Sequence, residues 1–270
     1  MEAPIAPKGA QATEEDLGGL LERVTAHYQP IVELETGAVA GFEALARVVD
    51  ADGTARSIGP YIEQIESDPE LLEQLMQRLL EAIRRDVVPL FARHPDFYVS
   101  VNVPPPILGT RKIVAMIEAL ELQPHLDRLV CEVTERQALT DAGRAALGLA
   151  RQRRIRVAID DFGTGHSGIV QLLGMSVDVL KIDRSQVEPL MKDAHADRLV
   201  RGVIALAASM RARVAAEGVE TAAQAFFLHA VGADYGQGWF WSAALPASEL
   251  PGVIERGFPH WRRDVHDRLK

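Results

Sequence analysis

Short apolar runs recur along the chain between residues 98 and 237, and segments with the apolar spacing of amphipathic helices lie between them. This alternation is typical of parallel strands joined by right-handed helical crossovers. It predicts strands at Tyr98–Asn102, Leu129–Thr134, Arg156–Asp161, Val179–Ile182, Arg213–Glu217 and Tyr235–Gln237. It predicts helices at Ile107–Leu120, Asp141–Gln152, Ser167–Leu173, Asp197–Met210 and Thr221–Val231, with a last helix after Pro246.

The pattern before residue 98 is different. Two strand-like runs, Tyr28–Leu34 and Val39–Val48, flank the turn Glu35-Thr36-Gly37 and predict a hairpin. Helical spacing follows at Gly59–Glu66 and Pro69–Asp86. We therefore expect an α/β fold, a modified (β/α)8 TIM-like barrel in which one early strand runs antiparallel to the rest.

Length and composition fit one such barrel. The chain has 270 residues, and a barrel of this kind needs about 250. Residues 1–19 are rich in Ala, Pro, Glu and Gly, so we expect a flexible tail there and a single domain over residues 20–270. The only cysteine, Cys131, lies in an apolar strand and is expected to be a buried, reduced thiol.

The net charge of −9 and the pI near 5.4 argue against a nucleic-acid polymer as the partner. The sequence has no apolar run of about 18 residues and no signal-peptide pattern at its start. We expect no membrane insertion and a cytoplasmic location.

Polar side chains stand where the predicted strands end. The C-terminal strand ends of such a barrel carry its chemistry, and carboxylates that meet there repel one another unless cations lie among them. Oxygen ligands suit Mg2+ or Mn2+, and the absence of a Cys/His cluster argues against structural zinc. These polar side chains at the strand ends therefore predict a divalent-metal site. Its members are Glu43, Asn102, Glu132, Asp160, Asp161, Lys181, Glu217 and Gln237.

Simpler explanations exist for some of these polar residues at the strand ends. Glu43 and Arg47 are four residues apart, which also suits an ion pair on a helix. Asp161 alone suits a helix N-cap. Lys181 and Asp183 share one strand face and could form an ordinary surface ion pair.

Eight motifs in one order resemble those of the EAL-domain cyclic di-GMP phosphodiesterase family, which is named after Glu43-Ala44-Leu45. The match runs from about Tyr28 to Pro246. The other motifs are Tyr28-Gln29-Pro30-Ile31-Val32, Ser100-Val101-Asn102, Glu132-Val133-Thr134-Glu135, Asp160-Asp161-Phe162-Gly163-Thr164-Gly165, Lys181-Ile182-Asp183-Arg184, Ala216-Glu217-Gly218-Val219-Glu220-Thr221 and Gln237-Gly238.

The resemblance implies a role for each matching residue. Glu43, Asn102, Glu132 and Asp160 are similar to the ligands of a first metal, and Asp160 and Asp161 to those of a second, with Glu217 nearby. Lys181 matches the lysine that orients or deprotonates the attacking water, and Glu135 matches the residue that anchors the loop after Asp161. The implied substrate contacts are Gln29, Arg47, Asp183 and Gln237.

The implied reaction is hydrolysis of cyclic di-GMP to linear 5′-pGpG with two Mg2+ or Mn2+, and we expect Ca2+ to inhibit it. The resemblance also implies a homodimer through the loop after Asp161 and adjacent helices. Two alternatives remain open: a receptor that binds cyclic di-GMP without turnover, and a protein-interaction module. The intact metal set and Lys181 argue against the first, and Arg47 with Gln237 against the second.

The sequence departs from the family pattern at a few positions. His166 and Gly168 replace an aromatic residue and a serine in the loop after Asp161, which concerns loop rigidity and dimer coupling. Ala243 and Ala244 replace a basic residue and a proline, so we expect lower substrate affinity. Trp239 and Trp241 flank the last strand, where core packing is expected to outweigh stacking on guanine.

Overall fold

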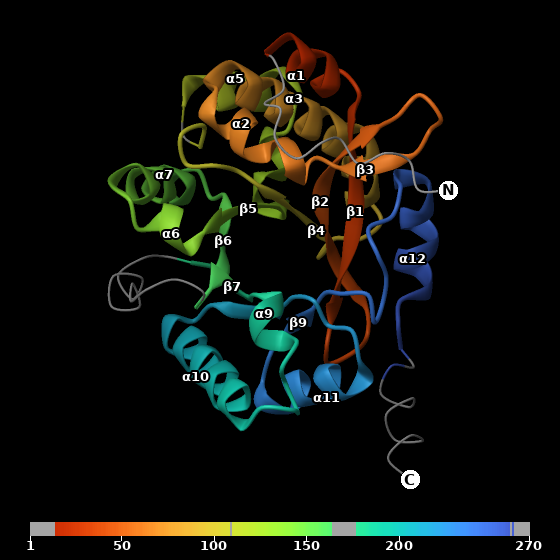
Figure 1. Cartoon of the computed structure of the whole chain (residues 1–270), viewed down its shortest axis with the longest axis vertical. Coiled ribbons are helices and arrows are strands. Elements are labelled where there is room, and N and C mark those ends of the chain that lie inside the picture. The colour runs from red at the N-terminus through yellow and green to blue at the C-terminus, as the bar shows by residue number, and fades with distance from the viewer. Residues whose placement is uncertain (1–13, 109, 164–176, 260, 262–270) are drawn as a thin grey trace.

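The structure of the protein is a computed structural model, shown in Figure 1, and it describes residues 14–108, 110–163, 177–259 and 261. Within these ranges one nine-stranded sheet has the order β1-β9-β8-β7-β6-β5-β4-β2-β3, and β1 also pairs with β2. This extra pairing closes eight strands into a barrel and leaves β3 as an outer extension of β2. The strands are β1 (Val24–Glu33), β2 (Val39–Val49), β3 (Ala55–Ser57), β4 (Tyr98–Asn102), β5 (Leu129–Thr134), β6 (Arg156–Phe162), β7 (Val179–Ile182), β8 (Arg213–Ala216) and β9 (Tyr235–Gly236).

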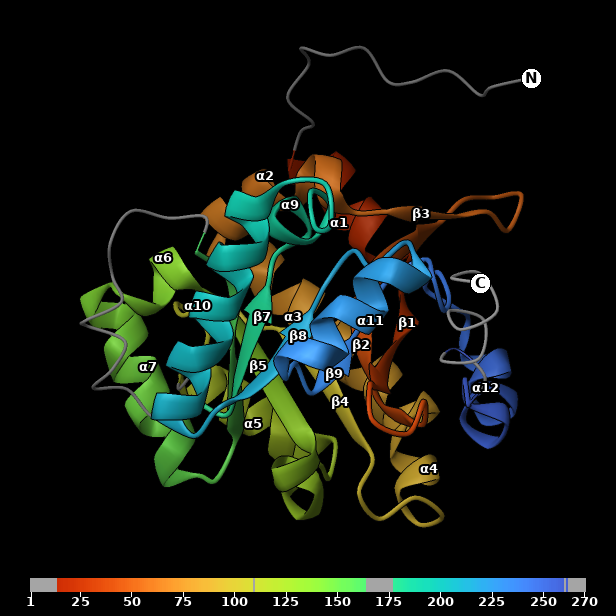
Figure 2. The same cartoon turned by 90° about the horizontal axis from the view of Figure 1, so that it is seen from below.

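The predicted departure from an ideal barrel is confirmed. Strand β1 pairs antiparallel with β2 and with β9, whereas the remaining barrel pairs are parallel. Val24 lies opposite Val48 and Val32 opposite Val39, so β1 begins at the end of the barrel where β2 finishes. Figure 2 shows α1, α9 and β3 at this end and α4 at the opposite end.

Helices surround the barrel in Figure 1. Pro69–Asp86 and Asp141–Gln152 have the predicted bounds because Asp68 and Thr140 cap them, each accepting backbone N–H bonds. The helices are α1 (Glu14–Leu21), α2 (Ile62–Ser67), α3 (Pro69–Asp86), α4 (Val88–Phe91), α5 (Arg111–Ala119), α6 (Glu135–Ala138), α7 (Asp141–Gln152), α9 (Arg184–Val187), α10 (Ala194–Met210), α11 (Ala222–Val231) and α12 (Leu250–Arg256), with 3-10 turns η1 (Gly59–Tyr61), η2 (Gln123–Arg128) and η3 (Ala247–Glu249).

Several predicted helix bounds were wrong. Helix α5 begins at Arg111 instead of residue 107, because the Thr110 side chain caps the N–H of Ile113. Helix α10 begins three residues early, because Asp193 caps its first turn. The predicted helix at Ser167–Leu173 lies outside the described residues. Among the helices that the structure describes, none combines the length and hydrophobicity needed to cross a bilayer.

The predicted boundary of the N-terminal tail was also wrong. Helix α1 covers Glu14–Leu21, and Leu17, Leu20 and Leu21 are buried against the core. Their spacing of three and four residues places them on one face of a helix. The Gly-rich composition of this stretch concealed that apolar face.

Leu17→Ala tests the boundary. Leu17 is 4% exposed, and truncating a buried leucine costs about 2–5 kcal/mol of unfolding free energy. We expect a loss in this range in urea unfolding. The control Leu199→Ala, at a side chain that is 40% exposed, should change stability by less than about 0.5 kcal/mol. A Leu17 variant as stable as the control would restore the tail prediction.

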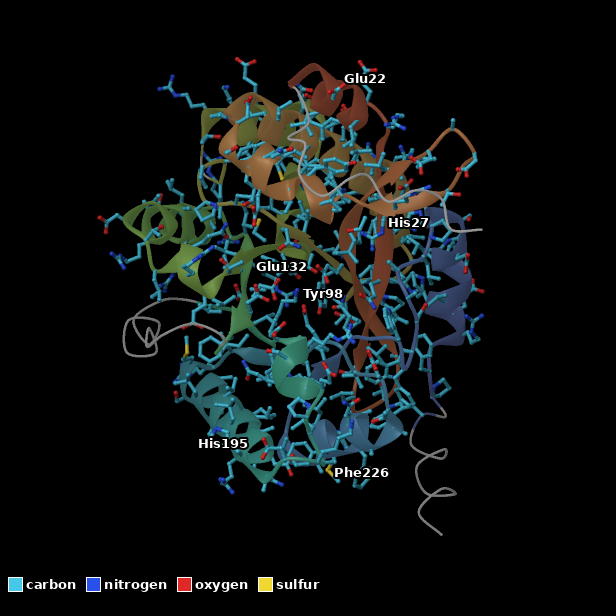
Figure 3. The ribbon with its side chains drawn as sticks, in the orientation of Figure 1. Glu22, His27, Tyr98, Glu132, His195 and Phe226 are labelled. Carbon is cyan, nitrogen blue, oxygen red and sulfur yellow. The ribbon has the colours of Figure 1, made fainter. Side chains whose placement is uncertain are left out.

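The barrel interior changes from apolar to polar along its axis. An apolar cluster lies at the end of the barrel opposite the C-terminal strand ends. It contains Ile31, Tyr98, Val130, Ala158, Val179 and Ala215. Two residues further along, β5 carries Glu132 and β7 carries Lys181, because side chains with period two face the same side of a strand. In Figure 3, Glu132 and Tyr98 lie inside the barrel, while His195 and Phe226 lie on the outer helices α10 and α11.

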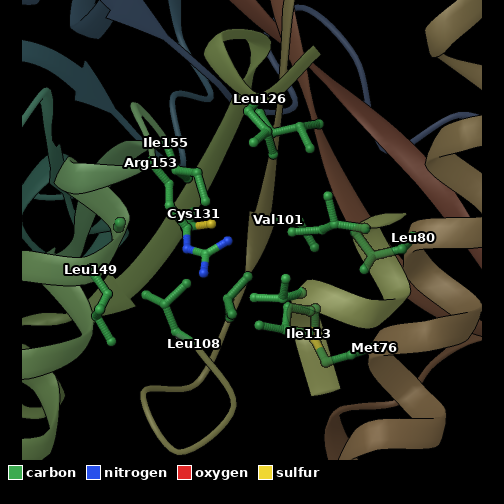
Figure 4. Close-up of a pocket in the computed structure, with 15 residues that line it drawn as sticks. Met76, Leu80, Val101, Leu108, Ile113, Leu126, Cys131, Leu149, Arg153 and Ile155 are labelled. Carbon is green, nitrogen blue, oxygen red and sulfur yellow. The ribbon is translucent and has the colours of Figure 1, made fainter. Parts of the chain in front are cut away.

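A small apolar cavity lies outside the barrel wall, beneath helices α3, α5 and α7 (Figure 4). Its volume is about 40 Å³, well below the roughly 150 Å³ of an engineered cavity that holds benzene. Cys131 lines it as a buried free thiol, as predicted. Burial and the neighbouring Glu132 raise the pKa of this thiol to about 12. The thiol is therefore protonated and a poor nucleophile at neutral pH.

Candidate active site

The C-terminal strand ends bring the predicted polar residues into one interior layer. Strand register places Asn102 beside Glu132 and Gln29 beside Glu43. The chain continues past β8 and β9 into Glu217 and Gln237, whose backbone N–H groups donate to neighbouring strands. Residues 100 or more positions apart in sequence therefore meet because the sheet closes.

Lys181 lies at the centre of this layer, and its side chain is 3% exposed. Its Nζ atom lies 2.5 Å from Glu217 Oε1 and 2.6 Å from Glu132 Oε2. Asp160 Oδ2 is 3.4 Å away and Glu43 Oε2 is 3.7 Å away. One ammonium group thus neutralises part of the charge of four carboxyl groups.

The pKa values follow from burial and from this shared charge. Burial alone would lower the pKa of Lys181, but the carboxylates of Glu132, Glu217, Glu43 and Asp160 raise it well above its ordinary value. Burial, and then repulsion by Glu43, raise the pKa of Glu132 despite the attraction of Lys181. Burial is also the main cause that raises the pKa of Glu217 to about 8. The layer therefore has too little positive charge for its four carboxyl groups, since Lys181 supplies one ammonium group.

The shortage of positive charge in this layer predicts that the stability of the protein depends on pH. The pKa of Glu217 is about 8 in the folded protein, against an ordinary value of 4.5. A carboxyl group with a raised folded pKa stabilises the fold below its unfolded pKa, and that contribution is lost as pH rises through the folded pKa. In EDTA, we expect the free energy of unfolding to fall between about pH 4.5 and pH 8. Urea unfolding of wild type and Glu217→Gln checks this, since an equal fall in both would contradict the assignment.

Amide side chains also hold the Glu43 carboxylate by hydrogen bonds. Gln237 Nε2 donates to Glu43 Oε2 at 2.6 Å and to Gln29 Oε1 at 3.0 Å. Asn102 Nδ2 donates to Glu43 Oε1 at 3.2 Å. Gln29 Nε2 in turn donates to the carbonyl oxygen of Ser242 at 3.1 Å. These amides connect β1, β2, β4 and the segment after β9 around one carboxylate.

Asp160 and Asp161 lie near the end of β6, and Asp161 has an unusual backbone conformation. The φ angle of Asp161 is 54°, in the left-handed region, which costs a non-glycine residue free energy. Its N–H donates to Asp160 Oδ1 at 2.9 Å. Burial, and then the charges of Asp160 and Asp183, raise the pKa of Asp161. Both carboxyl groups thus lie at the acidic layer, with Asp161 at its exposed edge.

Glu135 is buried behind this strand end. Its Oε2 atom accepts the N–H of Gly163 at 2.9 Å, so the structure brings it to the start of the loop after Asp161. A capping box between Thr134 and Gln137 fixes the first turn of α6, to which Glu135 belongs. The position of Glu135 therefore follows from the local sequence.

A pocket of about 260 Å³ opens beside the carboxylates and is lined by residues including Gln29, Glu43, Glu217, Gln237 and Trp239. Trp239 is 67% exposed, so the core-packing prediction was wrong for it. Gly238 turns the chain with φ 155°, at a place where a Cβ atom would lie 2.2 Å from the Val219 carbonyl oxygen. Trp239 therefore faces the rim, where the Arg184 guanidinium stands 5.3 Å from its ring centroid. Trp241 is buried, as predicted.

Two predicted substrate contacts lie further from the centre. Arg47 lines a neighbouring pocket of about 230 Å³ together with Asn102, and it donates to the carbonyl oxygen of Ala46. Asp183 accepts the N–H of Ser185 and caps α9. His166 and Gly168 lie outside the described residues.

The oxygen atoms of the side chains at this site are ligands that suit divalent cations. Glu43, Glu132, Asp160, Asp161 and Glu217 offer carboxylate oxygens and Asn102 an amide oxygen, which are ligands that Mg2+ and Mn2+ prefer. Within the described ranges, no three His, Cys, Asp or Glu side chains already stand in a metal-binding arrangement. The carboxylates turn towards the Lys181 ammonium instead. Their excess negative charge is what bound cations would neutralise.

A closed barrel with an acidic pocket at its strand ends defines a TIM-like α/β-barrel protein with an enzyme-type site. The family model described as the EAL domain matches residues 14–244. The chain belongs to the EAL domain family.

The chain is similar to several named proteins. It is 33% identical over 231 residues to the probable cyclic di-GMP phosphodiesterase PdeB of Escherichia coli (strain K12), covering 84% of this chain and 44% of PdeB. The solved structure of PaMucR phosphodiesterase in complex with c-di-GMP is 30% identical with a TM-score of 0.78, covering 87% of this chain and 98% of that one. The cyclic-di-GMP-bound form of the EAL enzyme Bd1971 is 28% identical with a TM-score of 0.77, covering 89% and 69%.

The curated relatives are longer than the match. The chain spans 44% of PdeB and 46% of PdeN, a second probable cyclic di-GMP phosphodiesterase of Escherichia coli (strain K12) that is 32% identical. The match to these relatives therefore concerns the barrel described above.

Proposed function

We propose that this chain hydrolyses cyclic di-GMP to linear 5′-pGpG in a metal-dependent reaction. The observation that carries the proposal is the buried Lys181 among four carboxyl groups at the strand ends of an EAL barrel. The relatives named as cyclic di-GMP phosphodiesterases support the substrate. A receptor without turnover would have no need of both the lysine and the full carboxylate set.

Two Mg2+ or Mn2+ ions would be held by the carboxylate layer. In this proposal Glu43, Asn102, Glu132 and Asp160 hold the first ion, and Asp160 and Asp161 hold the second, with Glu217 beside them. Cations bound as a pair lower the pKa of water and neutralise the phosphate oxygens.

The remaining side chains bind, orient and move protons. Lys181 orients the attacking water through its ammonium group, and the Glu217 carboxylate accepts the proton that this water gives up. Gln237 and Gln29 hold Glu43 in place through the amide contacts described above. Arg47 contacts a phosphate of the substrate, and Asp183, the N-cap of α9, provides a further substrate contact. The homodimer through the loop after Asp161 stays a prediction, since residues 164–176 are outside the described ranges.

A turnover assay with Mg2+ or Mn2+ tests this function. Purified protein is incubated with cyclic di-GMP, and the nucleotides are separated by chromatography. We expect pGpG with Mg2+ or Mn2+ and bound, intact substrate with Ca2+, whose longer and looser coordination suits in-line attack poorly. Bound but intact substrate in all three metals would indicate a receptor. Absence of binding would favour an interaction module.

Arg47→Ala should weaken substrate binding more than metal binding. A charge-assisted hydrogen bond contributes about 1.5–3 kcal/mol, so the Kd for cyclic di-GMP in Ca2+ should rise about 10- to 100-fold. Calorimetry measures both affinities. The control is Arg213→Ala, which removes an arginine paired with Asp234 away from the pocket. An Arg47 variant whose nucleotide Kd equals that of the control would rule out a phosphate contact.

A further inference from the structure

The peptide group between Phe162 and Gly163 is held from both sides by buried side chains. Its N–H, on Gly163, donates to Glu135 Oε2 at 2.9 Å. Its C=O, on Phe162, accepts a hydrogen bond from Gln186 Nε2. Glu135 is 5% exposed and Gln186 is 6% exposed. One amide plane therefore has its donor and its acceptor fixed by two different elements.

The two side chains come from the elements on either side of β6. Glu135 belongs to the first turn of α6, directly after β5, and Gln186 belongs to α9, directly after β7. Strands β5 and β7 are the neighbours of β6 in the sheet. The peptide group at the end of the middle strand is thus fixed by the chain that leaves each neighbouring strand.

Gln186 also fits closely around the next residue. Gly163 has φ 84°, and a Cβ atom built on it would lie 2.8 Å from Gln186 Nε2. The amide therefore reaches its position only because residue 163 is glycine. A buried amide placed against one backbone carbonyl needs a reason, since burying a polar group costs free energy unless it is hydrogen-bonded.

The backbone conformation of Asp161 explains why the Gln186 amide holds this carbonyl group. Asp161 lies one residue before the held peptide group, in a left-handed conformation with φ 54°. A strained residue persists only where its surroundings determine its conformation. Because the peptide group after Phe162 cannot rotate while both bonds are made, the backbone that carries the Asp161 carboxylate stays in this conformation.

We propose that Gln186 is a positioning residue, which together with Glu135 clamps the Phe162–Gly163 peptide group and so holds Asp161 in place for the second metal ion. This inference rests on the proposed metal-dependent function and adds a residue to it. The sequence motifs do not include Gln186. Its contribution acts through the backbone of Asp161 and involves no contact with the substrate.

The test compares Gln186→Met with Gln224→Met. Methionine keeps the length of glutamine and removes the amide donor. Gln224 is a matched control, because it is 5% exposed and donates Nε2 to the carbonyl oxygen of Val187 at 3.0 Å. Mn2+ affinity is measured by calorimetry without nucleotide, stability by thermal unfolding in EDTA, and turnover at several Mn2+ concentrations.

We expect Gln186→Met to bind Mn2+ about 10- to 100-fold more weakly, as is typical when a partner behind a metal ligand is lost. Gln224→Met should lose comparable thermal stability and keep the Mn2+ affinity of wild type. In Gln186→Met with Glu135→Gln, the loss of affinity should be smaller than the product of the two single effects, since both act on one peptide group.

Two outcomes overturn the inference: a Gln186→Met variant with wild-type Mn2+ affinity, or equal affinity losses in both methionine variants. A double variant whose losses multiply would show that the two side chains act independently, which also overturns the clamp. If wild type itself neither binds Mn2+ nor cleaves cyclic di-GMP, the proposed function fails. That result is distinct from a failure of the clamp.

Discussion

Lys181→Met is expected to bind cyclic di-GMP and leave it intact. Methionine fills the space of the lysine stem but cannot orient the attacking water for transfer of its proton. Positioned proton transfer contributes about 10²- to 10⁴-fold to a rate, and we expect kcat to fall by that amount at saturating Mg2+. Chromatography of the products measures turnover, and calorimetry in Ca2+ measures binding.

The same substitution should destabilise the protein when metal is absent. Lys181 is the ammonium group that Glu132 and Glu217 contact at 2.6 and 2.5 Å. Removing one partner of a buried ion pair costs about 3–5 kcal/mol. We expect a loss of this order in urea unfolding in EDTA at pH 8. The loss should shrink at pH 5, where the carboxyl groups with raised pKa values become protonated and need no counter-charge.

Lys192→Met, at an exposed position, is the control for removal of a lysine. It should change neither turnover nor stability measurably. Loss of nucleotide binding in Lys181→Met, with the fold intact, would show that the lysine serves affinity rather than the chemical step. Stability equal to wild type in EDTA would contradict the charge balance described for this layer.

Glu43→Gln should remove nearly all turnover. The substitution keeps the shape of the side chain but replaces one carboxylate oxygen by an NH2 group, in a place where Gln237 and Asn102 both donate to Glu43. The new NH2 group would then face an NH2 group of Gln237 or Asn102, with no acceptor between them. The first metal ion would also lose a charged ligand. Loss of a partner behind a metal ligand already costs about 10- to 100-fold. We therefore expect turnover to fall by more than about 100-fold.

Turnover at saturating Mn2+ and Mn2+ affinity by calorimetry check this result. Glu63→Gln, at an exposed glutamate on α2, provides the control and should behave as wild type. More than a few per cent of wild-type activity in Glu43→Gln at saturating metal would remove Glu43 from the metal ligands.

Strand positions were predictable where the pattern itself carried the information. β4, β5 and β7 have the predicted bounds, because mostly apolar residues fill both faces of each strand and a polar residue stands at its end or directly after it. The hairpin of β1 and β2 was predicted from its turn, but β1 begins at Val24, four residues earlier than expected. Pairing with Val48 extends β1, and a local pattern cannot reveal that tertiary partner.

Other features depend on contacts that a sequence does not display. The three residues of β3 form a strand only because they pair with the outer end of β2. Tryptophan is a large apolar residue of the kind that fills a core, yet the turn at Gly238 directs Trp239 to the rim of the pocket. Gln186 belongs to no recognised chemical motif, and its role emerges only once β6 and α9 are placed side by side.

The reversed direction of β1 also determines where the chain enters the barrel. In an all-parallel barrel the first strand would begin at the face opposite the catalytic one. Here β1 begins beside the end of β2, so α1 leads into the barrel from the face that holds the acidic pocket. Any segment joined ahead of α1 would therefore meet the barrel at the face that holds the acidic pocket, and not at the opposite face.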